Sequence, residues 1–126
     1  MKVMESAENY LETILMLKAS NGNVRSIDIA NELGYSKPSV SIAMKRLREK
    51  GHIVVEDGGN IELTDEGRRI AEKIYERHVL LTDLLMRIGV SADVAEEDAC
   101  RVEHYISEET FSKLKEHIES TTPKRK

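Results

Sequence analysis

The chain has 126 residues, of which 40% are hydrophobic and 33% charged, with two prolines, seven glycines and a formal net charge of −4. This balance excludes a disordered chain and a collagen-like repeat, and the shortage of turn residues argues against a strand-rich sandwich. Aromatic residues are too few, at 4%, for a surface that stacks single-stranded bases. No apolar run approaches the roughly 20 residues that span a bilayer, no signal peptide is evident, and one cysteine fits a reducing compartment. We therefore expect a mostly helical, cytoplasmic protein with no membrane partner.

Helical spacing and capping residues organise the first part of the chain. Apolar residues recur at helical intervals over 4–19, which predicts a first helix. Ser26 is a candidate N-cap for a short second helix, and Gly34 is placed to end it. Ser36 can then cap a third helix that ends at Gly51. Two short helices joined by a tight turn are typical of a helix-turn-helix.

The residues after the third helix change to a strand period. Two β-rich runs, 53–56 and 60–63, flank Asp57-Gly58-Gly59 and predict a small hairpin. Such a hairpin is not stable alone but can pack beside helices. Directly after a helix-turn-helix it predicts a winged helix, a fold that binds DNA in many proteins and serves as a protein-interaction module in others.

The second half of the chain predicts three more helices. Thr64 caps a long helix that has acidic residues in its first turn and continues to Gly89. Ser91 begins a helix expected to run through Ile106, and Ser107 begins the last one. The predicted fold is therefore mostly α, with an N-terminal winged helix-turn-helix followed by a helical region.

The negative net charge hides a basic segment in the third helix. Between Ser36 and Lys50, five basic residues stand against a single acidic residue. A localised basic stretch favours an anionic partner such as DNA, although a solvated helix face is the simpler alternative. The first residues of this helix are expected to meet base edges and the later basic ones phosphates. The predicted DNA-contacting residues are Ser36, Lys37, Pro38, Ser39, Ser41, Lys45, Arg46 and Arg48.

Three residues near the end of the chain have the chemistry of metal ligands. Cys100, Glu103 and His104 are related by i, i+3 and i+4, so in a helix all three project from one face. Thiolate, carboxylate and imidazole are side chains that a borderline transition metal accepts. The alternatives are a cysteine that packs as a small hydrophobe and a surface Glu-His pair, because no dense run of metal ligands is present.

Further ligands would have to come from other helices. Asn9 or Glu12 on the first helix and His78 on the long helix are the candidates. A divalent metal bound by these residues together with the cluster at 100–104 would join three helices. His78 could instead simply pack within the core.

Five stretches of the chain resemble the family of iron- and manganese-dependent transcriptional repressors, the diphtheria toxin repressor and manganese transport regulator type. The resemblance runs from residue 4 to about 120, and its most specific part is the last stretch together with His78. The matching stretches are residues 8–14, 28–30 with 36–41, 63–67, 77–81 and 100–107.

The resemblance implies a homodimeric repressor of metal-homeostasis genes, activated by a divalent metal bound between a winged-helix region and a helical dimerisation region. It places Glu12, His78, Glu103 and His104 on ligand positions of the family. Cys100 also falls on a ligand position, where the iron branch has cysteine and the manganese branch a carboxylate. Asn9 stands where the iron branch has methionine and the manganese branch aspartate.

This mixture of the two branches leaves both Mn²⁺ and Fe²⁺ as expected activators, with Co²⁺, Ni²⁺ or Zn²⁺ able to bind in vitro. The expected divisions are a winged-helix DNA-binding domain over 1–70, a metal-binding and dimerisation domain over 71–122, and a basic tail over 123–126. The SH3-like C-terminal domain of the iron branch is not expected. The dimer surface is expected on apolar positions of the helix at 91–106, with help from the first helix.

Two other functions are compatible with parts of this pattern. A winged-helix regulator could be gated by a small molecule or by oxidation of Cys100 rather than by a metal. A metal-dependent enzyme is disfavoured, because no general base or nucleophile accompanies the predicted ligands. A repressor should bind DNA only with metal, the rival regulator should bind without it, and an enzyme should turn over a substrate.

Overall fold

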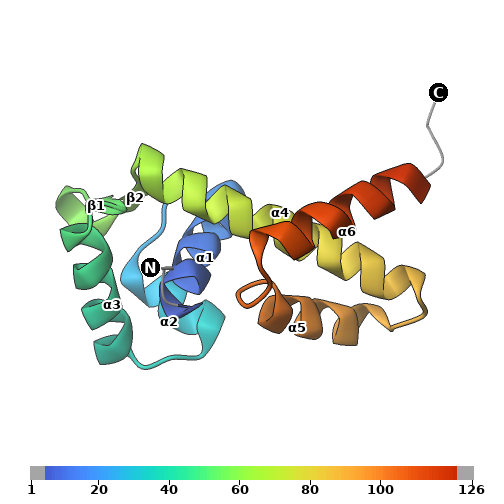
Figure 1. Ribbon diagram of the computed structural model, residues 1–126. Coiled ribbons are helices and arrows are strands. Elements are labelled where there is room, and N and C mark those ends of the chain that lie inside the picture. The colour runs from blue at the N-terminus through green and yellow to red at the C-terminus, as the bar shows by residue number, and fades with distance from the viewer. Residues whose placement is uncertain (1–4, 122–126) are drawn as a thin grey trace. The chain divides into compact units, whose positions relative to one another are not determined.

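The computed structural model describes residues 5–121 and divides into two units, 1–73 and 74–126. The division falls within the longest helix, and the expected basic tail over 123–126 lies outside the described residues. The elements in chain order are α1 (Glu5–Asn21), α2 (Ser26–Leu33), α3 (Lys37–Glu49), β1 (Ile53–Val55), a 3₁₀ turn (Asp57–Gly59), β2 (Ile61–Leu63), α4 (Asp65–Arg87), α5 (Ala92–Val102) and α6 (Glu108–Thr121) (Figure 1).

The N-terminal unit contains the predicted helix-turn-helix, with α2 and α3 joined by a tight turn. Gly34 ends α2 in the left-handed conformation at φ 71°, which glycine adopts without steric cost. Ser36 caps α3, and its Oγ accepts a hydrogen bond from the Ser39 N–H at 3.3 Å. The N-cap of α2 is Arg25 rather than the predicted Ser26. Asp28 explains the difference, because its carboxylate accepts the Arg25 N–H at 2.9 Å and so fixes the helix start one residue earlier.

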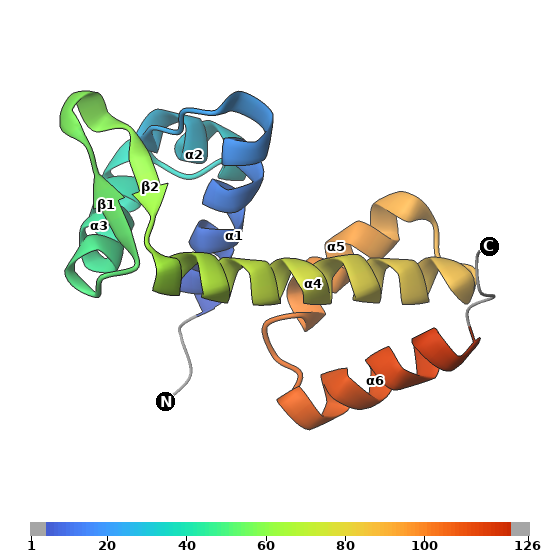
Figure 2. The same ribbon diagram turned by 90° about the horizontal axis from the view of Figure 1, so that it is seen from above.

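The hairpin predicted after α3 forms the wing of this unit. β1 and β2 are antiparallel, with Ile53 opposite Leu63 and Val55 opposite Ile61. The backbone N–H of Ile61 also donates to the Val24 carbonyl at 2.7 Å, which ties the wing to the segment before α2. The two views in Figures 1 and 2 show the hairpin beside α3. The core beneath it consists of fully buried apolar side chains, among them Leu11, Ile14, Val24, Ile29, Val40, Ile53 and Ile61.

The start of α4 is held against the wing at a position that requires glycine. A Cβ at Gly67 would lie 2.0 Å from the backbone oxygen of His52, so no larger residue fits there. Thr64 caps the helix as predicted: its Oγ1 accepts the Gly67 N–H at 3.1 Å and donates to the Gly51 carbonyl at 2.7 Å. The hairpin and the first turn of α4 are therefore fixed to each other.

The C-terminal unit is entirely helical in its described part, and α5 and α6 lie along the second half of α4 (Figures 1 and 2). Ser107 caps α6 as predicted, since its Oγ accepts the Thr110 N–H at 3.1 Å. The prediction that α5 runs through Ile106 is wrong, because the helix ends at Val102. None of the helices in residues 5–121 is long and apolar enough to cross a bilayer. The buried side chains of this unit include Ile74, Leu81, Ala95, Ala99, Phe111 and Ile118.

The architecture confirms a mostly α fold with an N-terminal winged helix-turn-helix followed by a helical region. Six α-helices and a two-stranded sheet account for the regular structure of the described residues.

Candidate metal centre and nucleic-acid interface

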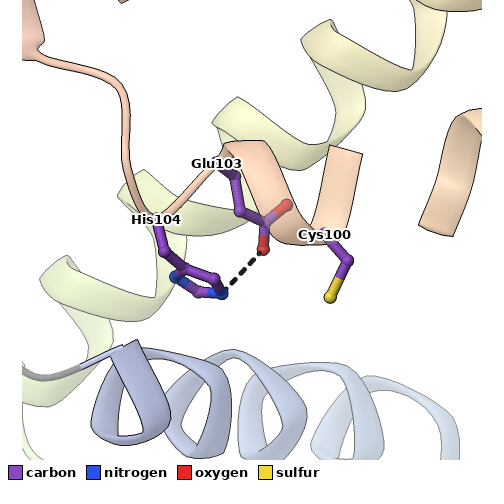
Figure 3. A group of neighbouring side chains, drawn as sticks. All are labelled: Cys100, Glu103 and His104. Atoms are coloured by element: carbon purple, nitrogen blue, oxygen red, sulfur yellow. Dashed lines mark ion pairs between the residues drawn. The ribbon is translucent and has the colours of Figure 1, made fainter. Parts of the chain in front are cut away.

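The end of α5 brings together the three residues that the sequence singled out. Cys100 lies in the last turn of the helix, Glu103 is the C-cap, and His104 follows in the turn before α6. The helical face predicted for this trio is therefore only partly formed. Their ligand atoms nevertheless all lie within 4.8 Å of one another. Figure 3 shows the thiol, the carboxylate and the imidazole directed toward the same space.

Glu103 is the central residue of this cluster. Its side chain is fully buried, with Oε1 2.9 Å from His78 Nδ1 and Oε2 3.5 Å from His104 Nε2. Oε2 makes no hydrogen bond to any described residue. A carboxylate taken out of water with one oxygen left without a donor is costly unless a cation compensates for it. The geometry around Oε2 thus fits a bound cation.

The donor atoms of the cluster fit a transition metal in particular. A thiolate, a carboxylate and an imidazole provide sulfur, oxygen and nitrogen, and calcium or magnesium would require oxygen ligands instead. The His104 side chain is 2% exposed, and His78 is 18% exposed. The site is therefore shielded from water, which strengthens electrostatic interactions within it. His78, Cys100, Glu103 and His104 could hold a divalent metal.

The two other predicted ligands lie on α1, in the N-terminal unit. Asn9 and Glu12 are three residues apart, so they project from one side of the helix. Glu12 is buried, and Asn9 is half-buried. The backbone carbonyl of Asn9 accepts a hydrogen bond from Thr13 Oγ1 at 2.8 Å. The participation of these two residues in a metal site stays a prediction.

Sequence reasoning did not identify the importance of Arg77, which precedes His78. Its side chain is 9% exposed and makes hydrogen bonds to the turn that carries Glu103 and His104. A signal was present, because Ile74, Arg77 and Leu81 are spaced so that the arginine interrupts the buried stripe of α4. A charged residue on an apolar stripe is rarely buried without specific partners.

The predicted DNA-contacting surface is exposed along α3 and the turn before it. All eight predicted residues, from Ser36 to Arg48, are exposed, whereas Val40, Met44 and Leu47 on the other side of the helix are buried. Arg46 and Arg48 lie in the last turn, where a cation also interacts favourably with the helix dipole. The helix therefore keeps an apolar side in the core and a basic side in solvent, as a recognition helix requires.

The two halves of the chain match two models of one protein family. Residues 2–59 match the N-terminal DNA-binding domain of iron-dependent repressors, and residues 64–124 match their metal-binding and dimerisation domain. The chain is 37% identical over 107 residues to the transcriptional regulator MntR of Escherichia coli O6:H1, covering 85% of this chain and 69% of the relative. It is 32% identical over 117 residues to an HTH-type transcriptional regulator of Methanocaldococcus jannaschii, covering 91% and 94%.

A solved structure described as a manganese-dependent transcriptional repressor in complex with manganese has the same fold. It superposes with a TM-score of 0.82 at 28% identity and covers 90% of this chain. The chain spans about half of that protein, 52% of its length. Since both halves of the sequence match the family and a relative is matched over nearly its whole length, the chain belongs to the iron-dependent repressor family of metal-dependent transcriptional regulators.

Proposed function

We propose that this protein is a metal-activated transcriptional repressor that binds operator DNA as a homodimer in the cytoplasm and controls metal-homeostasis genes. The observation that carries the proposal is the buried Glu103 carboxylate, whose Oε2 has no donor among the described residues and faces His104. The same chain contains a winged helix with an exposed basic side. The two features together support a DNA-binding protein controlled by a cation rather than by oxidation of Cys100 or by a small molecule.

The proposed ligands are Asn9, Glu12, His78, Cys100, Glu103 and His104. When bound, a divalent cation would neutralise the buried carboxylate of Glu103 and provide a common centre for side chains from different helices. Mn²⁺ is supported by the similar solved structures described as manganese regulators, and Fe²⁺ by the thiol of Cys100, since sulfur is a softer ligand than oxygen. The proposed metal-binding and dimerisation domain covers residues 71–122, and the DNA-binding domain residues 1–70.

The proposed DNA contacts follow from the position of each residue along α3. Ser36 caps the helix by accepting the Ser39 N–H, and its hydroxyl donates to Ser39 Oγ at 2.9 Å, so the two residues help to present the N-terminus of the helix to the major groove. Lys45, Arg46 and Arg48 would bind phosphates. Few side chains at the start of α3 can form bidentate contacts with bases, so DNA shape and thymine methyl groups would contribute to specificity.

The test is selection of binding sites from a random duplex DNA library, followed by affinity measurements with the selected duplex. Selection is performed with Mn²⁺, and binding is then measured in chelator, Mn²⁺, Fe²⁺, Co²⁺, Ni²⁺ and Zn²⁺, with the Fe²⁺ series kept anaerobic. We expect a specific sequence to bind tightly only with an activating metal. Equal affinity in chelator would contradict the proposal and favour a regulator gated by another signal.

A further inference from the structure

Arg77 is the most highly connected buried cation in the described part of the C-terminal unit. Its Nη1 donates to the backbone carbonyls of Glu103 at 3.1 Å and Ile106 at 3.0 Å. Its Nη2 donates to Glu108 Oε1 at 3.0 Å, and the guanidinium carbon lies 5.3 Å from the centre of the Phe111 ring. One side chain on α4 therefore binds both ends of the turn between α5 and α6.

This turn needs an external donor because α5 ends before the residues that carry the site. The last carbonyls of a helix have no N–H partner within the helix and must be satisfied from elsewhere. Glu103 is the C-cap of α5, and the stretch from His104 to Ser107 is not helical. Arg77 donates to the carbonyl of the C-cap Glu103 and to that of Ile106 in the turn, from one planar group whose donors are fixed in direction.

We infer that Arg77 is a positioning residue for the metal centre: it fixes the turn that carries Glu103 and His104 relative to His78, its neighbour on α4. The inference rests on the proposed function, because it assigns Arg77 a role toward the proposed ligands. Metal sites depend strongly on such supporting hydrogen bonds, and removing one typically weakens metal affinity roughly 10–100-fold. Here the support acts on the backbone of a ligand, so it determines where the carboxylate and the imidazole lie.

A positioning role of Arg77 can be distinguished from a purely electrostatic one, because the two roles predict opposite changes in Mn²⁺ affinity when the side chain is altered. A positive charge near a cation site disfavours the bound metal, so removing the charge alone should raise Mn²⁺ affinity. Removing the positioning hydrogen bonds should lower it. Arg77→Gln changes both properties, whereas Arg77→Lys keeps the charge and loses the planar pair of donors.

The experiment measures Mn²⁺ affinity by titration calorimetry in the wild-type protein, Arg77→Gln, Arg77→Lys and two controls. Arg87→Gln makes the same chemical change on α4, where Arg87 binds the exposed Asp83. Ile118→Val weakens the core of the same unit at a buried position of α6 rather than in the turn. Circular dichroism establishes that each protein is folded at the temperature of titration. Amide hydrogen exchange at Tyr105 and Ile106 reports the order of the turn without any metal.

We expect both Arg77 variants to bind Mn²⁺ roughly 10–100-fold more weakly than the wild type, with faster exchange in the turn. Both controls should keep wild-type affinity. Should Arg77→Gln fail to fold, Arg77→Lys alone decides the outcome. Unchanged or higher affinity in folded Arg77→Lys overturns the inference, as does an equal loss in Ile118→Val. Absence of Mn²⁺ binding by the wild type would contradict the proposed function instead, and exchange in the turn would still show whether Arg77 orders it.

Discussion

At the scale of single residues, the buried Glu103 carboxylate explains why the cluster at the end of α5 is unlike a surface Glu-His pair. Oε1 lies 2.9 Å from His78 Nδ1, but Oε2, 3.5 Å from His104 Nε2, has no hydrogen-bond partner among the described residues. Most buried polar groups in proteins are hydrogen-bonded, and a group that is not requires an explanation. A cation bound between these side chains provides one.

Removing either of these side chains is therefore expected to abolish metal binding. In Glu103→Ala and His104→Ala, calorimetric titration with Mn²⁺ should show no saturable site, because each change deletes a proposed ligand from a buried cluster. Matched controls are Glu97→Ala and His117→Ala, which remove the same side chains from exposed positions on α5 and α6. Affinity like that of the wild type in both Glu103→Ala and His104→Ala would contradict the metal centre.

Cys100 is expected to influence which metal activates the protein. Its thiol lies within 4.8 Å of the nearest ligand atoms of Glu103 and His104. A carboxylate suits Mn²⁺ better than sulfur does, so Cys100→Glu should shift activation of DNA binding toward Mn²⁺. The shift should be partial, because Asn9 would still provide a neutral oxygen where the manganese branch has a charged one.

The measurement is the concentration of Mn²⁺ and of Fe²⁺ that gives half-maximal binding to the selected duplex, under anaerobic conditions. The ratio of the two concentrations is compared between Cys100→Glu and the wild type, with Cys100→Ser as a control for loss of the thiol alone. An unchanged ratio in Cys100→Glu would show that Cys100 does not select the metal. Its thiol would then be only a small packing group.

Residue types and spacing were enough to identify Cys100, Glu103 and His104 as a group, but not to predict its geometry. The i, i+3, i+4 pattern assumes a continuous helix, and α5 ends at Val102. Arg77, which is distant in sequence, donates hydrogen bonds to two carbonyls of the turn that follows the helix. A contact between residues 26 or more positions apart leaves no periodic signal in the sequence.

At the scale of elements, a polar network fixes the wing to the rest of the N-terminal unit. Lys18 Nζ on α1 donates to Asn60 Oδ1 at 3.0 Å and to Glu62 Oε2 at 2.5 Å, and Asn60 also accepts the Val24 N–H at 3.1 Å. Hydrogen bonds from Lys18 and Asn60 hold the pKa of Glu62 below its ordinary value of 4.5. The strands are only three residues long, so this network supplements a short ladder.

The stability of the wing is therefore expected to fall in acid. Because the folded-state pKa of Glu62 is lowered, its contribution is complete above pH 4.5 and is lost as the pH falls through the lower folded value. Glu62→Gln should be less stable than the wild type near neutral pH, by less than about 1 kcal/mol for a partly exposed pair. The difference should shrink as the pH falls from about 6 to about 3.

Urea unfolding of both proteins across this pH range measures the difference in free energy of unfolding. Glu32→Gln is the control, because it changes an exposed carboxylate on α2, outside the wing and its network. A difference between Glu62→Gln and the wild type that does not change with pH would show that ionisation of Glu62 does not support the wing.

Local signals predicted most of the elements, because caps and periodicity act within a few residues. Gly34, Ser36, Thr64 and Ser107 all end or begin helices as expected. The start of α2 differs from the expectation by one residue, because a nearby side chain favours another N-cap. Arg25 replaces Ser26 as N-cap because Asp28 binds its N–H.

At the scale of the whole molecule, the exposed apolar side chains of α5 support the proposed homodimer. Val94 and Val102 on this helix are 46% and 40% exposed, whereas Ala95 and Ala99 are buried. Val94→Glu places a charge among these exposed side chains, which should weaken a dimer by about 2 kcal/mol or more, roughly 30-fold in affinity.

Sedimentation velocity over a range of protein concentrations measures this effect. The control is Val79→Glu, which adds the same charge to an exposed apolar position on α4. We expect the wild type and Val79→Glu to be dimers at micromolar concentration and Val94→Glu to be a monomer with unchanged helix content. Dimers of Val94→Glu as stable as those of the wild type would show that α5 is not the interface.

The two-fold symmetry of the proposed homodimer makes a further prediction about the DNA. Two copies of α3 related by a two-fold axis would enter successive major grooves on one face of the duplex, so the bound sequence should be a palindrome. Its half-sites should lie about 10–10.5 base pairs apart from centre to centre, or a multiple of this spacing.

Hydroxyl-radical footprinting on the selected duplex with Mn²⁺ should show protection related by two-fold symmetry. Inserting five base pairs between the half-sites turns one of them to the opposite face and should weaken binding, whereas inserting ten restores the face. A single asymmetric footprint, or equal binding to the duplex with five inserted base pairs, would mean that the two recognition helices do not bind DNA as a symmetric pair.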